Sequence, residues 1–102
     1  MRFFTRKVQM GYALAPKLLV DGRRKVRYMY RERPDNEQDS GWRFFTGDET
    51  DDYVNAPDNI GLYDVNTIAA IDPDIVPFLN RSAGSAFERE DETRPFTAVL
   101  ME

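Results

Sequence analysis

Four carboxylates within five positions form the densest group of chemically capable side chains in this sequence: Asp48, Glu49, Asp51 and Asp52. Carboxylate oxygens are hard ligands that could hold Ca²⁺ or Mg²⁺. The Ca²⁺ loop of an EF-hand is absent, because no glycine follows alternating acids and no glutamate closes the loop. Paired carboxylates can also hydrolyse glycosides, but that chemistry needs a defined separation across a cleft. The sequence therefore predicts no metal site here, and a solvated helix N-terminus is the plainer interpretation.

Other familiar chemistry is excluded by composition. The chain has no histidine and no cysteine. A Ser-His-Asp arrangement is therefore impossible, and so are zinc sites of the usual Cys/His type. The glycines do not follow the spacing of a phosphate-binding loop. We expect a protein that is not an enzyme and that has no cofactor, with a carboxylate-dependent hydrolase left open as an alternative.

The elements that must position these side chains belong to a small chain. With 102 residues, 41% of them hydrophobic and 13% aromatic, we expect one domain over residues 1–102 with a packed core. No apolar run approaches the ~20 residues that span a bilayer. The first residues carry charges without the apolar segment of a secretory signal. We expect no membrane association and a cytoplasmic location, which the lack of cysteine suits.

Charge is distributed unevenly along the chain. Residues 1–33 carry ten Lys/Arg against two acids, and residues 34–102 carry four against sixteen. The basic residues near Tyr28 and Tyr30 form an aromatic-basic pattern that could bind nucleic acid. The net charge of -4 opposes this function. We therefore expect no nucleic acid partner, and predict instead that the two halves pack together and neutralise each other.

Hydrophobic alternation and turn residues predict the order of elements. Strands are expected over 8–14, 17–20, 25–31, 41–46, 85–89 and 96–100, with a hairpin at Asp21-Gly22. Short helices are expected over 48–53, 65–71 and 74–79, the second capped by Asp64. In the strand 25–31, period-two spacing places Val26, Tyr28 and Tyr30 on one face, which we expect to be the core face.

This order predicts an α+β fold: a single domain with a mainly antiparallel sheet and one or two short helices packed on one face. An edge strand, such as the last one, could pair two chains into a homodimer.

Six motifs occur together in a fixed order. They are Y-M-Y-R-E at 28–32, D-S-G-W-R-F-F-T-G-D-E at 39–49, P-D-N-I-G-L-Y at 57–63, N-T-I-A at 66–69, I-D-P at 71–73 and G-S-A-F-E-R at 84–89. Across residues 12–90 the chain resembles a bacterial domain family of formerly unknown function, now grouped as immunity protein 33-like. Members of that group are immunity proteins of polymorphic toxin systems. The resemblance implies a protein that neutralises a toxin by masking its surface, and it brings no catalytic residues.

The expected partner is therefore a cognate toxin protein. Acidic patches that meet basic surfaces steer fast association, and exposed aromatic side chains dominate many interfaces. The candidate partner-binding residues are Trp42, Asp48, Glu49, Asp51, Asp52 and Tyr53. Trp42 qualifies only if it is exposed, since the aromatic residues of this region are mostly expected in the core. The alternative is a small regulatory domain that binds a small ligand or divalent metal through its carboxylates, which a pocket lined by Asp39, Asn59 and Asn66 would favour.

Overall fold

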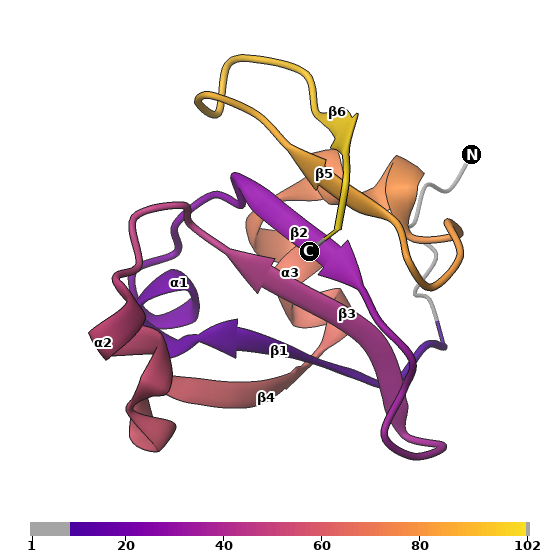
Figure 1. Cartoon of the computed structure of the whole chain (residues 1–102), viewed down its shortest axis with the longest axis horizontal. Coiled ribbons are helices and arrows are strands. Elements are labelled where there is room, and N and C mark those ends of the chain that lie inside the picture. Colours follow the sequence, from indigo (N-terminus) through magenta and orange to yellow (C-terminus); the bar gives the residue numbers. More distant parts are fainter. Residues whose placement is uncertain (1–8, 102) are drawn as a thin grey trace, which may run out of the picture.

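One six-stranded sheet organises the chain, with strand order β4-β1-β3-β2-β5-β6 (Figure 1). The computed structural model describes residues 9–101. The strands are β1 (Tyr12–Pro16), β2 (Tyr28–Arg31), β3 (Asp39–Phe45), β4 (Ile60–Asp64), β5 (Ala86–Glu88) and β6 (Thr97–Val99). All neighbours are antiparallel except β1 and β3, which run parallel. The predicted α+β fold with a mainly antiparallel sheet is confirmed, and the parallel pair is an addition to it.

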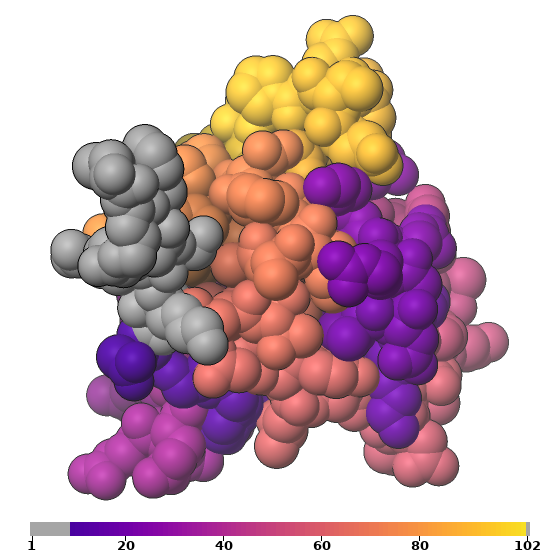
Figure 2. All heavy atoms as spheres, turned by 180° about the vertical axis from the view of Figure 1, so that it is seen from behind, coloured from indigo at the N-terminus to yellow at the C-terminus, as the bar shows by residue number. Residues whose placement is uncertain are grey.

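Helices cover one face of this sheet. The helix α1 (Lys17–Asp21), the helix α3 (Val65–Ile71) and the 3₁₀ helix η2 (Pro73–Phe78) contribute buried side chains to the core. Figure 2, which views the molecule from behind, shows α3 and η2 in the middle of this face. The helix α2 (Asp51–Asn55) and the 3₁₀ helix η1 (Pro57–Asn59) have no buried residues. They lie beside the sheet near β4 (Figure 1), so the opposite sheet face is left open.

The core lies between the sheet and the covering helices. Its fully buried members from the helices include Leu19, Val65, Ile68 and Ile75, and those from the sheet are Ala13, Ala15, Met29, Trp42 and Phe44. The rings of Trp42 and Phe44 stack with centroids 5.8 Å apart. The indole Nε1 of Trp42 donates to the carbonyl oxygen of Leu79 at 3.2 Å, so its burial leaves no unsatisfied donor.

The prediction of a strand over residues 17–20 and a hairpin at Asp21-Gly22 is wrong. These residues form α1, and the amide of Gly22 closes the helix by donating to the carbonyl oxygen of Leu18 at 3.1 Å. A short apolar run such as Leu18-Leu19-Val20 has no alternation, so periodicity does not separate a helical turn from a strand. Pro16 is the residue before the first helical residue, and its backbone is extended.

The face assignment of β2 is also wrong. Met29 is fully buried, whereas Tyr28 and Tyr30 are half-buried on the opposite face. Val26 is buried but precedes β2, in a stretch without regular strand geometry. Alternation therefore does not continue from Val26 into the strand, and the tyrosines point away from the core.

Each of the three predicted helices has a helical counterpart in the structure. The helix over 65–71 is confirmed as α3, and Asp64 caps it by accepting from the amide of Asn66 at 2.8 Å. The expected second helix after Pro73 is the 3₁₀ helix η2. The acidic helix begins at Asp51 instead of Asp48, because the side chain of Thr50 caps it by accepting from the amide of Tyr53 at 3.1 Å.

Candidate functional site

The open sheet face carries a cluster of three aromatic rings: Tyr28 and Tyr30 from β2, and Phe45 from β3. Tyr28 is paired with Phe45 across the two strands, and side chains that are paired in this way share a face. The ring centroids lie 5.7 Å apart for Tyr28 and Tyr30, 6.2 Å for Tyr28 and Phe45, and 6.1 Å for Tyr30 and Phe45. All three rings are half-buried. We call this group the aromatic platform.

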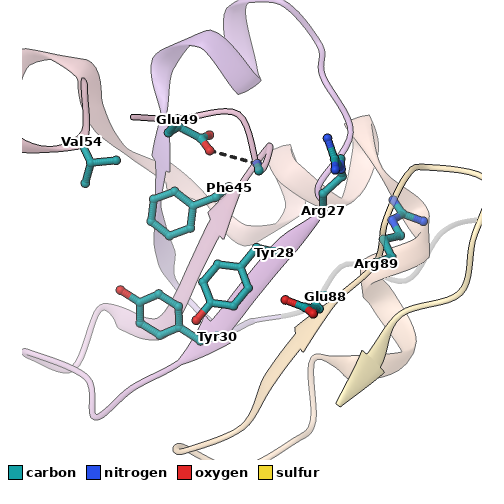
Figure 3. Close-up of a pocket in the computed structure, with 9 residues that line it drawn as sticks. Arg27, Tyr28, Tyr30, Phe45, Glu49, Val54, Glu88 and Arg89 are labelled. Carbon is teal, nitrogen blue, oxygen red and sulfur yellow. Dashed lines mark hydrogen bonds between the residues drawn. The ribbon is translucent and has the colours of Figure 1, made fainter. Parts of the chain in front are cut away.

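A groove of about 430 Å³ lies over the aromatic platform (Figure 3). Glu49 and Val54 border it on one side, and Glu88 stands on the other side beside Tyr28. A second hollow, lined by Tyr28, Glu88, Val99 and Leu100, continues the groove toward the C-terminal strand. Val54 and Leu100 are 36% and 92% exposed, so apolar surface reaches both ends of this path.

The arginines around the open face already have carboxylate partners. Arg24 and Arg27 pair with Asp48. Because both arginines come from the basic half of the chain and Asp48 comes from the acidic half, the predicted neutralisation between the halves does occur here.

Two further arginines are buried and matched. Arg43 on β3 pairs with Asp39 at 2.8 Å and with Glu32 at 2.6 Å. Arg89 pairs with Asp72 at 2.7 Å and with Asp74 at 2.8 Å, and its side chain is 1% exposed. Neither of these guanidinium groups adds unbalanced positive charge to the surface.

Two groups near the platform have pKa values that are shifted from their ordinary values. The hydrogen bonds from Arg43 hold the pKa of Asp39 far below its usual range, so Asp39 is a carboxylate in the folded protein. Partial burial, helped by the nearby charge of Glu32, raises the pKa of Tyr30. The hydroxyl of Tyr30 therefore stays protonated at neutral pH and presents an uncharged polar tip to the groove.

The structure divides the predicted acidic cluster into two parts. Asp48 is held by the two arginines described above. The carboxylate of Glu49 accepts from the amide of Thr46 at 2.8 Å, from the Thr46 hydroxyl at 3.0 Å and from the amide of Gly47 at 3.0 Å. Asp51 and Asp52 are exposed in the first turn of α2 and form no ion pair within residues 9–101. Of the four acids, these last two can meet a partner without breaking a contact among the described residues.

The two aromatic candidates have internal roles as well. Trp42 is 0% exposed, so a surface role for it is wrong: it belongs to the core that covers the opposite face of β3. Tyr53 is half-buried, and its hydroxyl accepts from the amide of Leu18 at 3.3 Å, which ties α2 to α1.

The ligand-binding alternative gains no support from the geometry. Within residues 9–101 no three acidic side chains come together in a way that could hold a metal ion. Asn59 donates to the carbonyl oxygen of Tyr53 at 3.0 Å, and Asn66 donates to Asp64 at 2.8 Å. Asp39 is buried against Arg43. Each of the three proposed pocket residues is thus engaged in a contact within the fold.

Nothing in the described part of the chain has the length and apolarity of a membrane-spanning helix. The fold and the open face define a small α+β domain whose exposed sheet surface is aromatic at its centre and acidic at its margins. The family model of the immunity protein Imm33 domain matches residues 13–100. The chain therefore belongs to the Imm33 immunity protein family, as the motifs of the sequence indicated. No curated protein and no solved structure is detectably similar to it.

Sequence reasoning missed the platform. It assigns Tyr28 and Tyr30 to the core face, and it expects Phe45, like the other aromatic residues of this region, mostly in the core. A signal was present, because aromatic side chains occupy both faces of 42–45 and only one face can carry the helices.

Proposed function

We propose that this protein is an immunity-type inhibitor that binds a cognate toxin protein in the cytoplasm and masks the toxin's working surface. The family match over residues 13–100 carries this proposal. Immunity protein families generally act without catalysis, and this chain has no histidine or cysteine with which to build common catalytic groups. A binding role requires only a surface of complementary shape and charge.

The proposed contact surface combines the open sheet face with the exposed side of α2. Asp51 and Asp52 supply negative charge at one margin, and Val54 on the same helix borders the groove. Asp48, Glu49 and Tyr53 lie at this margin too, where they hold the surface in shape through the contacts described above. An acidic margin of this kind attracts a basic toxin surface and accelerates association.

The test is co-production of this protein with each toxin-like protein encoded beside its gene, scored by growth of the producing cells. We expect one such protein to arrest growth alone and to be tolerated when this chain is present. Isothermal titration with the purified pair should then show a stoichiometric complex. Growth arrest that persists with this chain present, together with no heat of binding for any neighbouring product, would overturn the proposal.

A charge-reversal pair locates the contact. Reversing Asp51 and Asp52 together to lysine should weaken toxin binding by about tenfold or more and reduce its salt dependence, because margin charges act mainly through long-range attraction. Reversing Asp35 and Glu37 together to lysine is the control. This variant also reverses two exposed acids, but they lie in the loop between β2 and β3, which Figure 1 places at the far end of the sheet from α2. Equal losses in both variants would mean that only net charge matters.

A further inference from the structure

We infer that the groove over the aromatic platform receives an arginine side chain from the protein partner. The inference rests on the proposed function for the identity of that partner as a toxin.

The platform has the geometry that a guanidinium group prefers. The rings of Tyr30 and Phe45 are nearly parallel, with 13° between their planes and centroids 6.1 Å apart. The face of an aromatic ring is electron-rich, and cations bind over it at about 6 Å or less from the ring centroid. No cation of residues 9–101 lies over Tyr30 or Phe45 in this way.

Elsewhere the fold itself stacks arginine on aromatic rings. The guanidinium carbon of Arg89 lies 4.2 Å from the centroid of Phe96, and that of Arg31 lies 5.8 Å from Trp42. In both cases an oxygen acceptor holds the guanidinium over the ring. This acceptor is the carboxylate of Asp72 for Arg89 and the carbonyl oxygen of Ser40 for Arg31. The platform offers the same combination of a ring and an oxygen acceptor to a cation from outside.

Glu88 supplies the oxygen acceptor beside the aromatic platform. It pairs with Tyr28 across β5 and β2, so its side chain projects from the same face as the platform rings. Figure 3 shows its carboxylate beside the ring of Tyr28. Glu88 is exposed, and its carboxylate has no ion pair or hydrogen bond within residues 9–101.

The balance of charge selects a cation over an anion. Arg43 and Arg89 are each matched by two carboxylates, whereas Arg27 shares the single carboxylate of Asp48 with Arg24. Glu88 has no counter-charge in the described part of the chain, and Asp51 and Asp52 add further negative charge beyond Val54. A negatively charged ligand would therefore meet net repulsion, whereas a basic side chain gains a carboxylate partner.

Arginine fits this groove better than lysine does. Its guanidinium is planar and weakly hydrated, so it can lie flat on a ring while its edge donates two hydrogen bonds to one carboxylate. An ammonium group is compact and strongly hydrated, and it would have to lose more water to enter an apolar groove of this kind.

The test uses a small probe, N-acetyl-arginine methylamide, titrated into the full chain labelled with ¹⁵N and observed by amide chemical shifts. We expect saturable shifts confined to β2, Phe45 and Glu88. The citrulline analogue has nearly the same shape but no charge, and it should bind at least about fivefold more weakly. Equal binding of the citrulline or the leucine analogue would overturn the inference, as would shifts centred on Asp51 and Asp52.

Two variants and one control connect the probe to the residues. Glu88→Gln and Tyr30→Leu should each weaken probe binding about fivefold, with the amide spectrum showing an intact fold. Glu90→Gln removes the same charge two residues further along, at an exposed position outside the groove, and should change nothing. Equal effects of Glu88→Gln and Glu90→Gln would overturn the inference.

The same variants separate this inference from the proposed function. If the toxin binds and Glu88→Gln weakens the complex about tenfold, both stand. If the toxin binds Glu88→Gln as tightly as the unmodified chain, the function stands and the arginine inference fails. If no toxin binds but the probe behaves as expected, the groove chemistry stands and the immunity proposal fails.

Discussion

Asp39 and Arg43 form a two-pronged ion pair within a single strand, with Nη1 to Oδ1 and Nη2 to Oδ2 distances of 2.8 Å each. Residues four apart in a regular strand are separated by about 13 Å. Here β3 is irregular, because Tyr12 of β1 pairs with Asp39 while Leu14 pairs with Arg43. The four-residue advance from Asp39 to Arg43 along β3 therefore corresponds to an advance of only two residues along β1. This bulge allows the side chain of Arg43 to reach back to Asp39.

Gly41 makes this bulge feasible, which leads to the first prediction. Its φ is +87°, and an added Cβ would overlap the carbonyl oxygen of Glu32. Gly84 has a similar φ of +99° but open space around it. We expect Gly84→Ala to cost about 1–2 kcal/mol through backbone strain alone, and Gly41→Ala to cost at least about 2 kcal/mol more. Urea unfolding measures both, and equal costs would show that β3 relaxes around the new methyl group.

The ion pair itself leads to the second prediction. The side chains of Asp39 and Arg43 are 0% and 2% exposed, so removing the Asp39 charge leaves the buried Arg43 with only the partly exposed Glu32 as a partner. Asp39→Asn should lower the free energy of unfolding by about 3 kcal/mol. Glu32→Gln also removes a partner of Arg43, but the Glu32 side chain is 42% exposed, so its loss should cost less than about 1 kcal/mol. A larger loss for Glu32→Gln than for Asp39→Asn would contradict this ranking.

The third prediction concerns pH. Arg43 lowers the pKa of Asp39 in the folded protein, whereas the unfolded chain has the ordinary value of about 3.9. As pH falls through that value, the unfolded state takes up the proton first and gains stability relative to the folded state. The stabilisation is thus complete above about pH 5 and declines below about pH 4. The difference in unfolding free energy between the unmodified chain and Asp39→Asn should therefore narrow from about pH 7 to about pH 3, and a constant difference would refute the assignment.

The fourth prediction concerns Arg89, which joins three separate segments. It contacts Asp72 and Asp74 near η2, donates from Nε to the carbonyl oxygen of Val26 at 2.9 Å, and lies over Phe96. Lysine cannot reproduce a planar group with several donors, so Arg89→Lys should lower unfolding free energy by about 2–4 kcal/mol.

Arg94→Lys is the matched control for Arg89→Lys. The same chemical change at this exposed residue should stay within about 0.5 kcal/mol, with urea unfolding as the measurement for both variants. If the two substitutions cost the same, the buried contacts of Arg89 do not stabilise the fold.

Local sequence signals predicted the elements whose determinants are close together in the chain. Asp64 followed by an apolar stripe indicated α3, because a capping side chain and its target amide are neighbours. The alternating aromatic residues of 41–46 indicated β3. The motifs were specific enough to identify the family, and the absence of histidine and cysteine excluded much catalytic chemistry through composition alone.

The site depended on contacts that no local pattern contains. Alternation in 28–31 shows that the two faces of β2 differ, but only the packing of α3 and η2 decides which face is buried. The same packing placed Trp42 in the core and left Tyr28 and Tyr30 outside. The acidic cluster looks like a single patch in the sequence, yet Asp48 is held by arginines more than twenty residues away.

The sequence by itself thus determined the fold class, the family, and which chemical groups are present. The tertiary structure decided which of those groups reach the surface and which are already matched with one another. The physical reason is that burial and charge pairing arise between segments distant in sequence, as between Arg89 and Asp72 or Arg24 and Asp48. Their free energies exist only once the sheet and its covering helices have assembled.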